Sequence, residues 1–417
     1  MNIKLSSISN SFTGRINIGG SKSISNRLLI VKGLAGDSTD ISNLSDSDDT
    51  LRLSEYLKRI KSCEQSGVAM IIDVGNAGTV ARFLATYLAF REGTWLITGS
   101  ERMMKRPMKE LVDGLIHLGA KISYQKKEGY LPIKITGNEL SGKEVDVDVT
   151  RSSQFISALM LIGPYFEEGL KINFIGKPVS MPYIIMTAEL MKKFGAKLEL
   201  TTDGVKIDYK EYDYYPAEVE PDWSSASYWY ELVALSENGE IFLPDFQKNS
   251  LQGDSILKDI FNELGVITRY SKEGIQLSKS TKITDHFIYD FSGTPDIVPA
   301  VMVTCAALGI DSEFKNIGQL AFKESDRIEA LKNELEKIGA SLVKKNNSYL
   351  LTTHNSKSNN LFFNTYNDHR MAMCFAPLVM RFNEIEIENH EIVNKSYPTY
   401  WNDFKNLNFA HLKMQTT

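Results

Sequence analysis

The chain has 417 residues, more than one hydrophobic core normally spans, so we expect two domains. Apolar residues make up 42% and charged residues 24% of the sequence, which are ordinary proportions for a globular protein. The net charge of -5 argues against nucleic acid as the main partner, because a phosphate backbone requires a basic face.

The predicted elements begin with a polar turn that leads into an apolar helix at residues 19–30, GGSKSISNRLLI. Other apolar helices with polar starts follow in chain order at 73–90, 149–163, 179–195, 292–308, 322–335 and 365–380. Helix starts expose unpaired N–H groups and a partial positive charge, so they attract anions, and a nearby Lys or Arg strengthens the capture. We therefore expect these helix starts to bind anions, although a single Ser, Thr or Asp there is more often a cap.

One design recurs along the chain, an amphipathic helix that ends at a glycine and is followed by a strand. The copies lie at 111–124, 190–200, 256–270 and 330–343, and their glycines are Gly119, Gly195, Gly265 and Gly339. Glycine after a helix adopts the left-handed conformation at little cost. Residues 53–74 and 399–409 are a weaker and a truncated copy. The regular spacing predicts stacked α/β units, although any α/β protein contains such joins.

Several common signatures are absent. Cys63, Cys305 and Cys374 are widely spaced, which predicts neither a zinc cluster nor a disulfide framework. We expect no transmembrane helix, and the N-terminus lacks a signal pattern, so we expect a cytoplasmic enzyme. GNAGT at 75–79 lacks the dinucleotide spacing, and the P-loop, GxSxG and HExxH motifs do not occur.

Twelve short motifs, in family order from residue 20 to residue 400, resemble those of the 3-phosphoshikimate 1-carboxyvinyltransferase (EPSP synthase) family. They are GSKSISNRLLI, DSDDT, GNAGTVAR, KRPMKELVDGL, SSQFISALML, PYIIMTAELMKKFG, DWSSASY, LQGDS, PDIVPA, KESDRI, YNDHRMAM and KSYPTY. Each motif alone is modest, but the set is specific because it spans nearly the whole chain.

The resemblance implies an α/β fold of two domains, each built from three βαβαββ repeats. This is the enolpyruvyl transferase fold, which is arranged like an inside-out α/β barrel. The first three-repeat domain would be residues 21–220, and the second would combine residues 1–20 with residues 221–417. The active site would lie in the cleft between them, at the helix N-termini of both domains.

The implied reaction transfers the enolpyruvyl group of phosphoenolpyruvate to the 5-hydroxyl of shikimate 3-phosphate by addition–elimination. The products are 5-enolpyruvylshikimate 3-phosphate and phosphate, on the shikimate pathway to chorismate and the aromatic amino acids. The resemblance implies no cofactor and no metal. The partners would be these two small molecules, without nucleic acid or membrane, and the enzyme would be a monomer.

The resemblance also assigns the site residues. Asp296 would take the proton of the 5-hydroxyl, Glu324 would protonate the methylene carbon, and Lys22 and Lys323 would assist catalysis. The residues implied for shikimate 3-phosphate are Lys22, Ser23, Arg27, Ser152, Ser153, Gln154, Ser180, Tyr183, Asp296, Gln319 and Lys323. The residues implied for phosphoenolpyruvate are Lys22, Gly78, Arg106, Gln154, Arg327, Arg370 and Lys395, with Gly78 leaving room for the ligand.

Structural roles compete with these assignments. With Pro295 at the first helical position, Asp296 fits the cap region of a helix. Asp326 and Asp368 have equally good structural interpretations. His369, beside Asp and Arg, is more often an orienting residue than a metal ligand. The aromatic group at 224–232 is most simply part of the core.

Two rival functions stay open. The sister enzyme that acts on UDP-N-acetylglucosamine generally carries a reactive Cys in a loop, and residues 100–110 contain none. A non-catalytic anion-binding module would not require both Asp296 and Glu324. The sequence departs from the family pattern at Gly19-Gly20, which would loosen the loop, and at Gln319, Ala321, Pro221 and Trp223.

Overall fold

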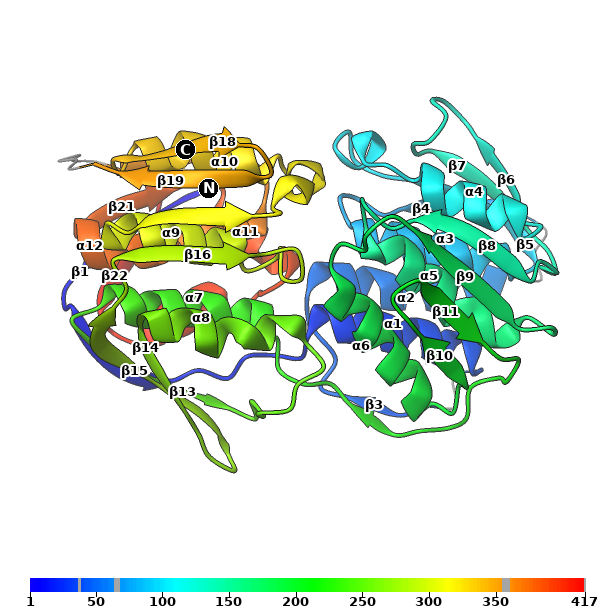
Figure 1. Cartoon of the computed structure of the whole chain (residues 1–417), viewed down its shortest axis with the longest axis horizontal. Helices are drawn as coiled ribbons and strands as arrows, with labels where there is room; N and C mark the ends of the chain where they lie inside the picture. Colours follow the sequence, from blue (N-terminus) through cyan, green and yellow to red (C-terminus); the bar gives the residue numbers. More distant parts are fainter. Residues whose placement is uncertain (37–38, 64–67, 355–360, 416–417) are drawn as a thin grey trace. The chain divides into compact units, whose positions relative to one another are not determined.

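The computed structural model describes residues 1–417 except 37–38, 64–67, 355–360 and 416–417 (Figure 1). The described chain divides into two compact units. The N/C unit consists of Met1–Ser21 and Glu220–Thr417, and the middle unit consists of Lys22–Val219. The chain therefore starts in one unit, builds the whole of the other, and then returns.

The N/C unit contains three four-stranded sheets of one topology. One repeat has the elements β16 (His286–Asp290), α9 (Val298–Leu308), β17 (Asp311–Lys315), α10 (Arg327–Glu336), β18 (Ala340–Lys345) and β19 (Ser348–Thr353). β16 and β17 pair in parallel, and the other two pairs of this sheet are antiparallel. This order is the predicted βαβαββ repeat.

The two N-terminal strands complete the other sheets of this unit. The sheet β14-β15-β13-β2 contains β2 (Ser11–Arg15), β13 (Asn238–Pro244), β14 (Leu264–Tyr270) and β15 (Gly274–Ile283), with helices α7 (Trp223–Leu235) and α8 (Leu257–Glu263). The sheet β20-β21-β1-β22 contains β1 (Asn2–Ser7), β20 (Leu361–Phe363), β21 (Glu384–Ile387) and β22 (Ala410–Gln415), with helices α11 (His369–Phe375), α12 (Val379–Phe382) and α13 (Tyr400–Asn406). Strand β1 lies between β21 and β22, so the two chain ends share one sheet.

The middle unit repeats this topology twice. The first copy contains β4 (Met70–Asp73), α3 (Gly78–Ala89), β5 (Gly93–Thr98), α4 (Lys109–His117), β6 (Lys121–Tyr124) and β7 (Ile133–Gly137). The second contains β8 (Glu144–Asp148), α5 (Ser153–Ile162), β9 (Leu170–Ile175), α6 (Met181–Lys193), β10 (Leu198–Leu200) and β11 (Gly204–Ile207). The remaining elements are α1 (Lys22–Leu34), β3 (Ile41–Ser42), α2 (Asp48–Cys63) and β12 (Ala217–Glu218). In the described residues their sheet has two parallel strands, so the third repeat is shorter than predicted.

Short 3-10 helices connect several of these elements. They are η1 (Met103–Lys105), η2 (Gly163–Tyr165), η3 (Gly253–Ile256), η4 (Gly318–Phe322), η5 (Ala376–Leu378) and η6 (His390–Lys395).

The helix–glycine–strand design is confirmed at all four predicted copies. Gly119, Gly195, Gly265 and Gly339 have φ values of 99°, 83°, 89° and 78°. These values lie in the left-handed region that glycine enters without steric cost. In the truncated copy, Asn408 takes this role at φ 53°. In the weaker copy, α2 and β4 are present, and residues 64–67 between them lie outside the described part of the chain.

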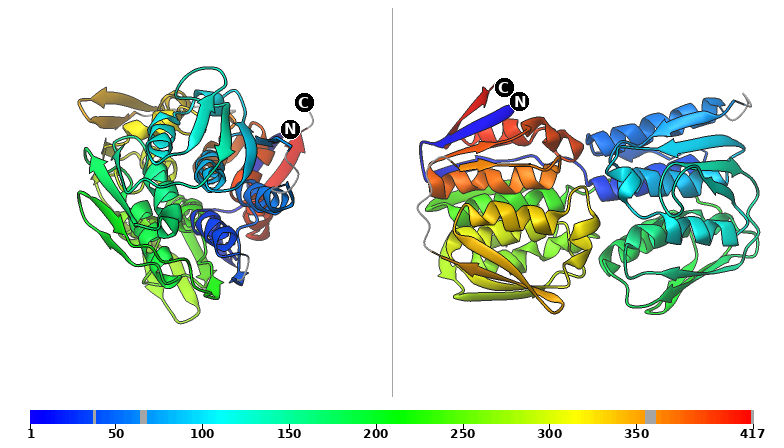
Figure 2. Two further views of the ribbon diagram at one scale, coloured as in Figure 1. Left: turned by 90° about the vertical axis from the view of Figure 1, so that its right-hand side faces the viewer. Right: turned by 90° about the horizontal axis from the view of Figure 1, so that it is seen from above.

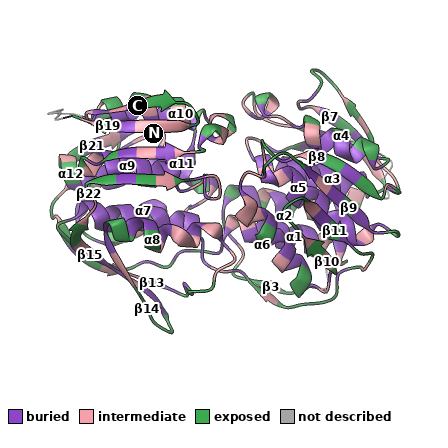
Figure 3. Cartoon of the chain, viewed as in Figure 1, coloured by how far each residue is buried: buried purple, intermediate pink, exposed green. Residues whose placement is uncertain are grey.

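The first helix of each repeat is buried, and the sheets lie outside the helices (Figures 2 and 3). In the N/C unit α7, α9 and α11 pack on one another, and every residue of α7 is buried. In the middle unit α1, α3 and α5 pack together in the same way. A helix that is apolar on all sides, such as VPAVMVTCAAL in α9, requires such burial. The predicted core position of residues 224–232 is confirmed.

None of the described helices is both long enough and apolar enough to cross a bilayer.

Candidate functional site

The predicted site residues form two groups, one in each unit. The group in the N/C unit is Asp296, Gln319, Lys323, Glu324, Arg327, Arg370 and Lys395. The group in the middle unit is Lys22, Ser23, Arg27, Gly78, Arg106, Ser152, Ser153, Gln154, Ser180 and Tyr183. Most members of both groups lie at or just before the N-terminus of a helix.

Asp296 is the centre of the first group. Its Oδ2 forms an ion pair with Nη2 of Arg370 at a distance of 2.9 Å. Its Oδ1 lies 3.4 Å from both Nζ of Lys323 and Nη1 of Arg327. Burial by itself would raise the pKa of Asp296, but Arg370, Lys323 and Arg327 hold that pKa well below its usual range. Asp296 is therefore a carboxylate in this structure.

Arg327 connects this centre to a second carboxylate. Its side chain is 1% exposed, and its Nε and Nη2 donate to the two oxygens of Asp368 at 2.8 and 3.2 Å. Asp368 is fully buried and also accepts a 3.0 Å bond from Ser325. Burial would lower the pKa of Arg327, but Asp368 and Glu324 raise it above the usual value. The guanidinium is thus held in one orientation as a cation.

Glu324 lies at the edge of the same cluster. Its Oε2 accepts a 2.8 Å bond from Nη2 of Arg327, and its Oε1 lies 3.6 Å from Nζ of Lys395. Lys395, at the end of η6, is mostly buried. Four cations, contributed by three separate segments, therefore surround three carboxylates.

In the middle unit, Arg27 is a buried cation on α1. Its guanidinium donates to the hydroxyls of Thr187 and Ser157, at 2.7 and 3.1 Å, and to the carbonyl oxygen of Ser23 at 2.7 Å. It lies over the ring of Phe83 at 5.4 Å. Burial lowers the pKa of Arg27 to about 10, and Tyr183 acts in the opposite direction. These neutral acceptors leave its positive charge available to an anion.

Gly78 lies between two arginines. A Cβ atom on Gly78 would be 2.5 Å from Nη1 of Arg82 and 2.6 Å from Cζ of Arg106. Arg106 donates to the carbonyl oxygen of Asn76 at 3.0 Å. The guanidinium groups of Arg82 and Arg106 therefore leave no space for a side chain at position 78, in addition to the room predicted there for a ligand.

Gln154 and Lys22 are each held by a neighbour on another helix. The Gln154 amide accepts from Arg82 at 2.7 Å and donates to Thr79 at 3.0 Å. Lys22, the first residue of α1, pairs with Asp49 in the first turn of α2 at 3.1 Å. Helix packing therefore supplies the partners that orient the polar ends of both side chains.

The serines of this group differ in their backbone roles. Ser152 caps α5 by accepting from the N–H of Gln154, as the structural interpretation expects. Ser153 begins α5 and is buried. Ser180 precedes α6 at φ 57°, a strained conformation for serine, and makes no capping bond. Because Ser180 does not cap its helix, its role in the helix does not explain its conformation. Backbone strain of this kind concentrates at functional sites.

The cap interpretation is correct for two aspartates and wrong for the third. Asp326 caps α10 and Asp368 caps α11 through their side chains. Asp296 does not cap α9, because that helix begins at Val298 with Ile297 as its N-cap residue. Pro295 is therefore not the first helical residue. Asp296 lies before the helix, where its carboxylate pairs with Lys323, Arg327 and Arg370.

Comparisons with known proteins identify the family of this chain. The sequence profile of the family EPSP synthase (3-phosphoshikimate 1-carboxyvinyltransferase) matches residues 7–404. The chain belongs to this family. A 3-phosphoshikimate 1-carboxyvinyltransferase of Bacteroides fragilis is 42% identical over 398 residues, which cover 95% of each chain. One from Shewanella pealeana is 34% identical and covers 95% of this chain and 97% of its own.

A solved structure supports the fold of the family. The EPSP synthase of Acinetobacter baumannii matches with a TM-score of 0.76 at 19% identity, over 99% of this chain and 100% of its own.

The departures from the family pattern have distinct surroundings. Gln319 lies in η4, and its buried Nε2 has no hydrogen-bond partner among the described residues. Trp223 is buried edge-on against Phe246, with ring centroids 4.8 Å apart, so it fills the core. The expected loosening at Gly19-Gly20 is wrong, because Gly20 forms a bridge with Pro221. Ala321 is a further member of η4.

Sequence reasoning missed the partners that orient the site. Asp49 belongs to the DSDDT motif, Arg82 to GNAGTVAR and Asp368 to YNDHRMAM. Each lies in a quoted motif, but none of the three motifs shows which residue of another segment its member contacts. Tyr228, whose hydroxyl lies 3.4 Å from Nη1 of Arg370, ends the motif DWSSASY, which likewise does not show this contact.

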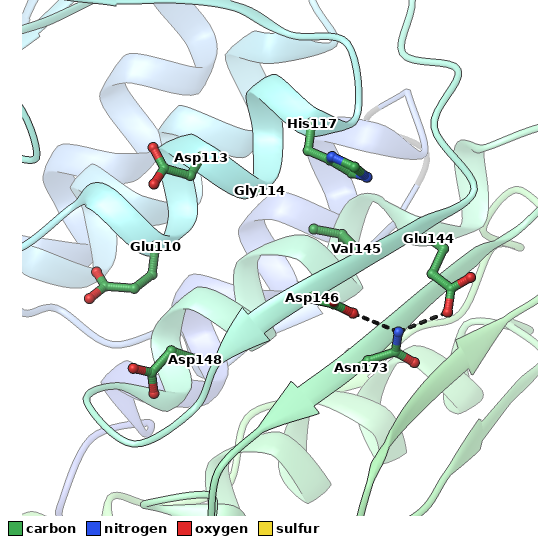
Figure 4. A pocket seen from close by; sticks show the side chains of 9 residues that line it. All are labelled: Glu110, Asp113, Gly114, His117, Glu144, Val145, Asp146, Asp148 and Asn173. Carbon is green, nitrogen blue, oxygen red and sulfur yellow. Dashed lines mark hydrogen bonds between the residues drawn. The ribbon is translucent and has the colours of Figure 1, made fainter.

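A pocket of about 670 Å³ lies in the middle unit between α4, β8 and β9 (Figure 4). None of the predicted site residues lines it. Its carboxylates are Glu110, Asp113, Glu144, Asp146 and Asp148. This density of negative charge disfavours anionic ligands, so the pocket does not suit phosphorylated carboxylates. Throughout the described ranges, no group of three or more His, Cys, Asp or Glu residues is arranged to hold a metal ion.

Proposed function

We propose that this chain transfers the enolpyruvyl group of phosphoenolpyruvate to the 5-hydroxyl of shikimate 3-phosphate and releases phosphate. The observation that carries the proposal is the cluster around Asp296, where three cations lie within 3.4 Å of one carboxylate next to Glu324. Both substrates carry a phosphate and a carboxylate. A site for them needs several cations and two groups that exchange protons, and this cluster contains both.

The binding roles follow from the chemistry of each side chain. We assign Lys22, Ser23, Arg27, Ser152, Ser153, Gln154, Ser180, Tyr183 and Gln319 to shikimate 3-phosphate, together with Asp296 and Lys323. We assign Gly78, Arg106, Arg327, Arg370 and Lys395 to phosphoenolpyruvate, together with Lys22 and Gln154. Arginine grips carboxylates and phosphates through paired N–H groups. The unpartnered amide of Gln319 supplies a donor for a hydroxyl of the sugar-like ring.

Turnover then requires members of both groups. The middle unit supplies Arg27 and Arg106 as cations, whereas the N/C unit supplies both proposed proton-transfer groups. The domain bounds 21–220, and 1–20 with 221–417, are part of this proposal. It predicts that a neutral residue at Arg27 and one at Arg370 each abolish turnover.

The proposed addition step balances as follows. Glu324 donates a proton to C3 of phosphoenolpyruvate, the 5-oxygen bonds to C2, and Asp296 takes the proton of the 5-hydroxyl. Elimination reverses both transfers: Glu324 takes a proton from the new methyl group, the bond from C2 to the phosphate oxygen breaks, and Asp296 returns its proton to the leaving phosphate. Acid–base assistance of this kind typically contributes about 10²–10⁴-fold each.

Substrate binding would make Asp296 a stronger base. With three cations beside it, Asp296 is a weak base, because they stabilise its charged form. The carboxylate and phosphate of phosphoenolpyruvate compete with Asp296 for Arg370 and Arg327. Once these guanidinium groups turn to the substrate, the pKa of Asp296 rises and the carboxylate becomes able to accept the 5-hydroxyl proton.

The deciding experiment measures phosphate release by the purified chain. We expect release from phosphoenolpyruvate only when shikimate 3-phosphate is present. Release that depends on UDP-N-acetylglucosamine would instead identify the sister activity. Binding of phosphoenolpyruvate without release under any condition would identify a non-catalytic anion-binding module.

We also propose that the protein works as a monomer in the cytoplasm, on the pathway to chorismate and the aromatic amino acids. Among the described residues, Cys305 and Cys374 are buried thiols outside any disulfide, which suits a reducing compartment. Light scattering should give the mass of one chain, and a mass of two or more chains would contradict the monomer.

A further inference from the structure

Asp254 is a buried carboxyl group that the proposed chemistry does not use. It lies in η3, where its side chain is 3% exposed. Ser224, in the first turn of α7, donates its hydroxyl to Oδ2 of Asp254 at 2.5 Å. The other oxygen, Oδ1, is buried and has no hydrogen-bond partner among the described residues. A buried carboxyl group with one unsatisfied oxygen is costly, so it calls for an explanation.

The position of Asp254 is rigidly defined. Gln252, just before η3, donates to the carbonyl oxygen of Pro221 at 2.8 Å and accepts from the N–H of Trp223 at 3.0 Å. These bonds join η3 to the start of α7. Together with the bond from Ser224, they hold Asp254 beside the start of α7.

The charged groups around Asp254 come from several elements. Asp296 precedes α9, Arg370 begins α11, and Asp222 caps α7. All three act on the charge of Asp254. Burial, Asp259, Asp290 and, to a smaller extent, Asp254 raise the pKa of Tyr289 on β16. The geometry agrees, because Ser224, which donates to Asp254, lies one turn before Tyr228 on α7, and the Tyr228 hydroxyl lies 3.4 Å from Nη1 of Arg370.

We propose that Asp254 is a positioning residue that is protonated when phosphoenolpyruvate binds, and that its ionisation weakens the capture of this anion by Arg370. The inference rests on the proposed function. A neutral Asp254 leaves Asp296 as the carboxylate paired with Arg370 at 2.9 Å. An ionised Asp254 adds a second negative charge that competes with the substrate for the same guanidinium and repels the substrate directly.

The electrostatic surroundings agree with a proton that is exchanged near neutrality. Burial and the charge of Asp296 raise the pKa of Asp254 to about 7, whereas the hydrogen bond from Ser224 and the charge of Arg370 act in the opposite direction. Stability or activity that depends on the neutral form is therefore present at pH 6 and declines toward pH 8. Removing the Ser224 hydroxyl should move the titration to higher pH, because that bond favours the ionised form.

The test compares the full chain with Asp254→Asn, Ser224→Ala and the control Asp259→Asn. Asp259 is an exposed aspartate in the neighbouring helix α8, so its variant makes the same chemical change outside the site. The KM for phosphoenolpyruvate is measured at saturating shikimate 3-phosphate from pH 6 to pH 8.5. Carbon-13 NMR of labelled aspartate carboxyl groups follows the titration without any dependence on turnover.

We expect one carboxyl resonance with a midpoint near neutral pH, absent in Asp254→Asn and shifted to higher pH in Ser224→Ala. The ratio of the wild-type KM to that of Asp254→Asn should rise with pH by roughly 3- to 10-fold, the scale of one added buried charge. Asp259→Asn should show no rise. The ratio removes the ionisation of the substrate itself, which is common to both proteins.

Two results would overturn the role of Asp254. One is a wild-type spectrum in which the carboxyl resonance that Asp254→Asn removes does not titrate between pH 6 and 8. The other is a KM ratio that stays flat with pH. If the wild-type chain releases no phosphate at any pH, the proposed function itself fails, which differs from turnover with a flat ratio.

Discussion

Arg327→Met tests whether the cation cluster is held together by one buried side chain. Arg327 is 1% exposed and donates to Asp368, Glu324 and Asp296. The substitution leaves Asp368, which is fully buried, without its guanidinium partner. Removing one member of a buried ion pair costs about 3–5 kcal/mol, because the other charge remains desolvated.

This cost converts into a measurable shift of the melting temperature. For a unit of 150–250 residues, 1 kcal/mol shifts the Tm by about 2–4 °C, so Arg327→Met should lower it by about 6–20 °C. Differential scanning calorimetry at pH 7 gives the value for the unit concerned. The matched control is Arg381→Met, an exposed arginine at the end of α12, for which we expect a change below about 2 °C.

A double variant separates lost charge from lost packing. Arg327→Met with Asp368→Asn removes both charges and keeps an oxygen at position 368 to cap α11. The double variant should melt at a higher temperature than Arg327→Met alone, because no unpaired carboxylate remains buried. A double variant that loses the sum of both single effects, or an Arg327→Met protein that melts like wild type, would refute the reasoning.

Three further predictions concern individual side chains. Asp296→Asn should lower kcat by about 10²–10⁴-fold while calorimetry shows phosphoenolpyruvate binding unchanged or tighter, because Arg370 and Arg327 are released from the carboxylate. Equal losses of turnover and of this binding would make Asp296 a structural residue. Gly78→Ala should raise the KM for phosphoenolpyruvate by about 10- to 100-fold, because its Cβ displaces Arg82 and Arg106, and an unchanged KM would contradict this steric argument. Glu231 is fully buried, and burial raises its pKa well above 4.5. The folded state therefore keeps the proton of Glu231 more tightly than the unfolded state does, so this contribution to the free energy of unfolding is present in acid and is lost as the pH rises. Thermal melts of wild type and Glu231→Gln should therefore diverge by up to about 1.4 kcal/mol per pH unit above pH 4.5, with the variant gaining; parallel pH profiles would show that Glu231 does not titrate in this way.

The local sequence was sufficient for the repeats. Gly119, Gly195, Gly265 and Gly339 mark the ends of four helices because only glycine enters the left-handed region without cost, a property of the residue alone. The apolar run of α9 likewise predicted burial, because such a helix has no polar face to present to water. The motifs predicted the family, and the family profile confirmed it.

The partners of the site residues were decided by the tertiary structure. Asp296 meets Lys323 of its own repeat and Arg370 of another repeat because the starts of α9, α10 and α11 pack close together. No spacing along the chain encodes that contact. The same holds for Gly78, whose neighbours Arg82 and Arg106 determine why it must lack a side chain. Residue conformations follow from local sterics, whereas charge balance and pKa depend on long-range packing, which only the folded chain supplies.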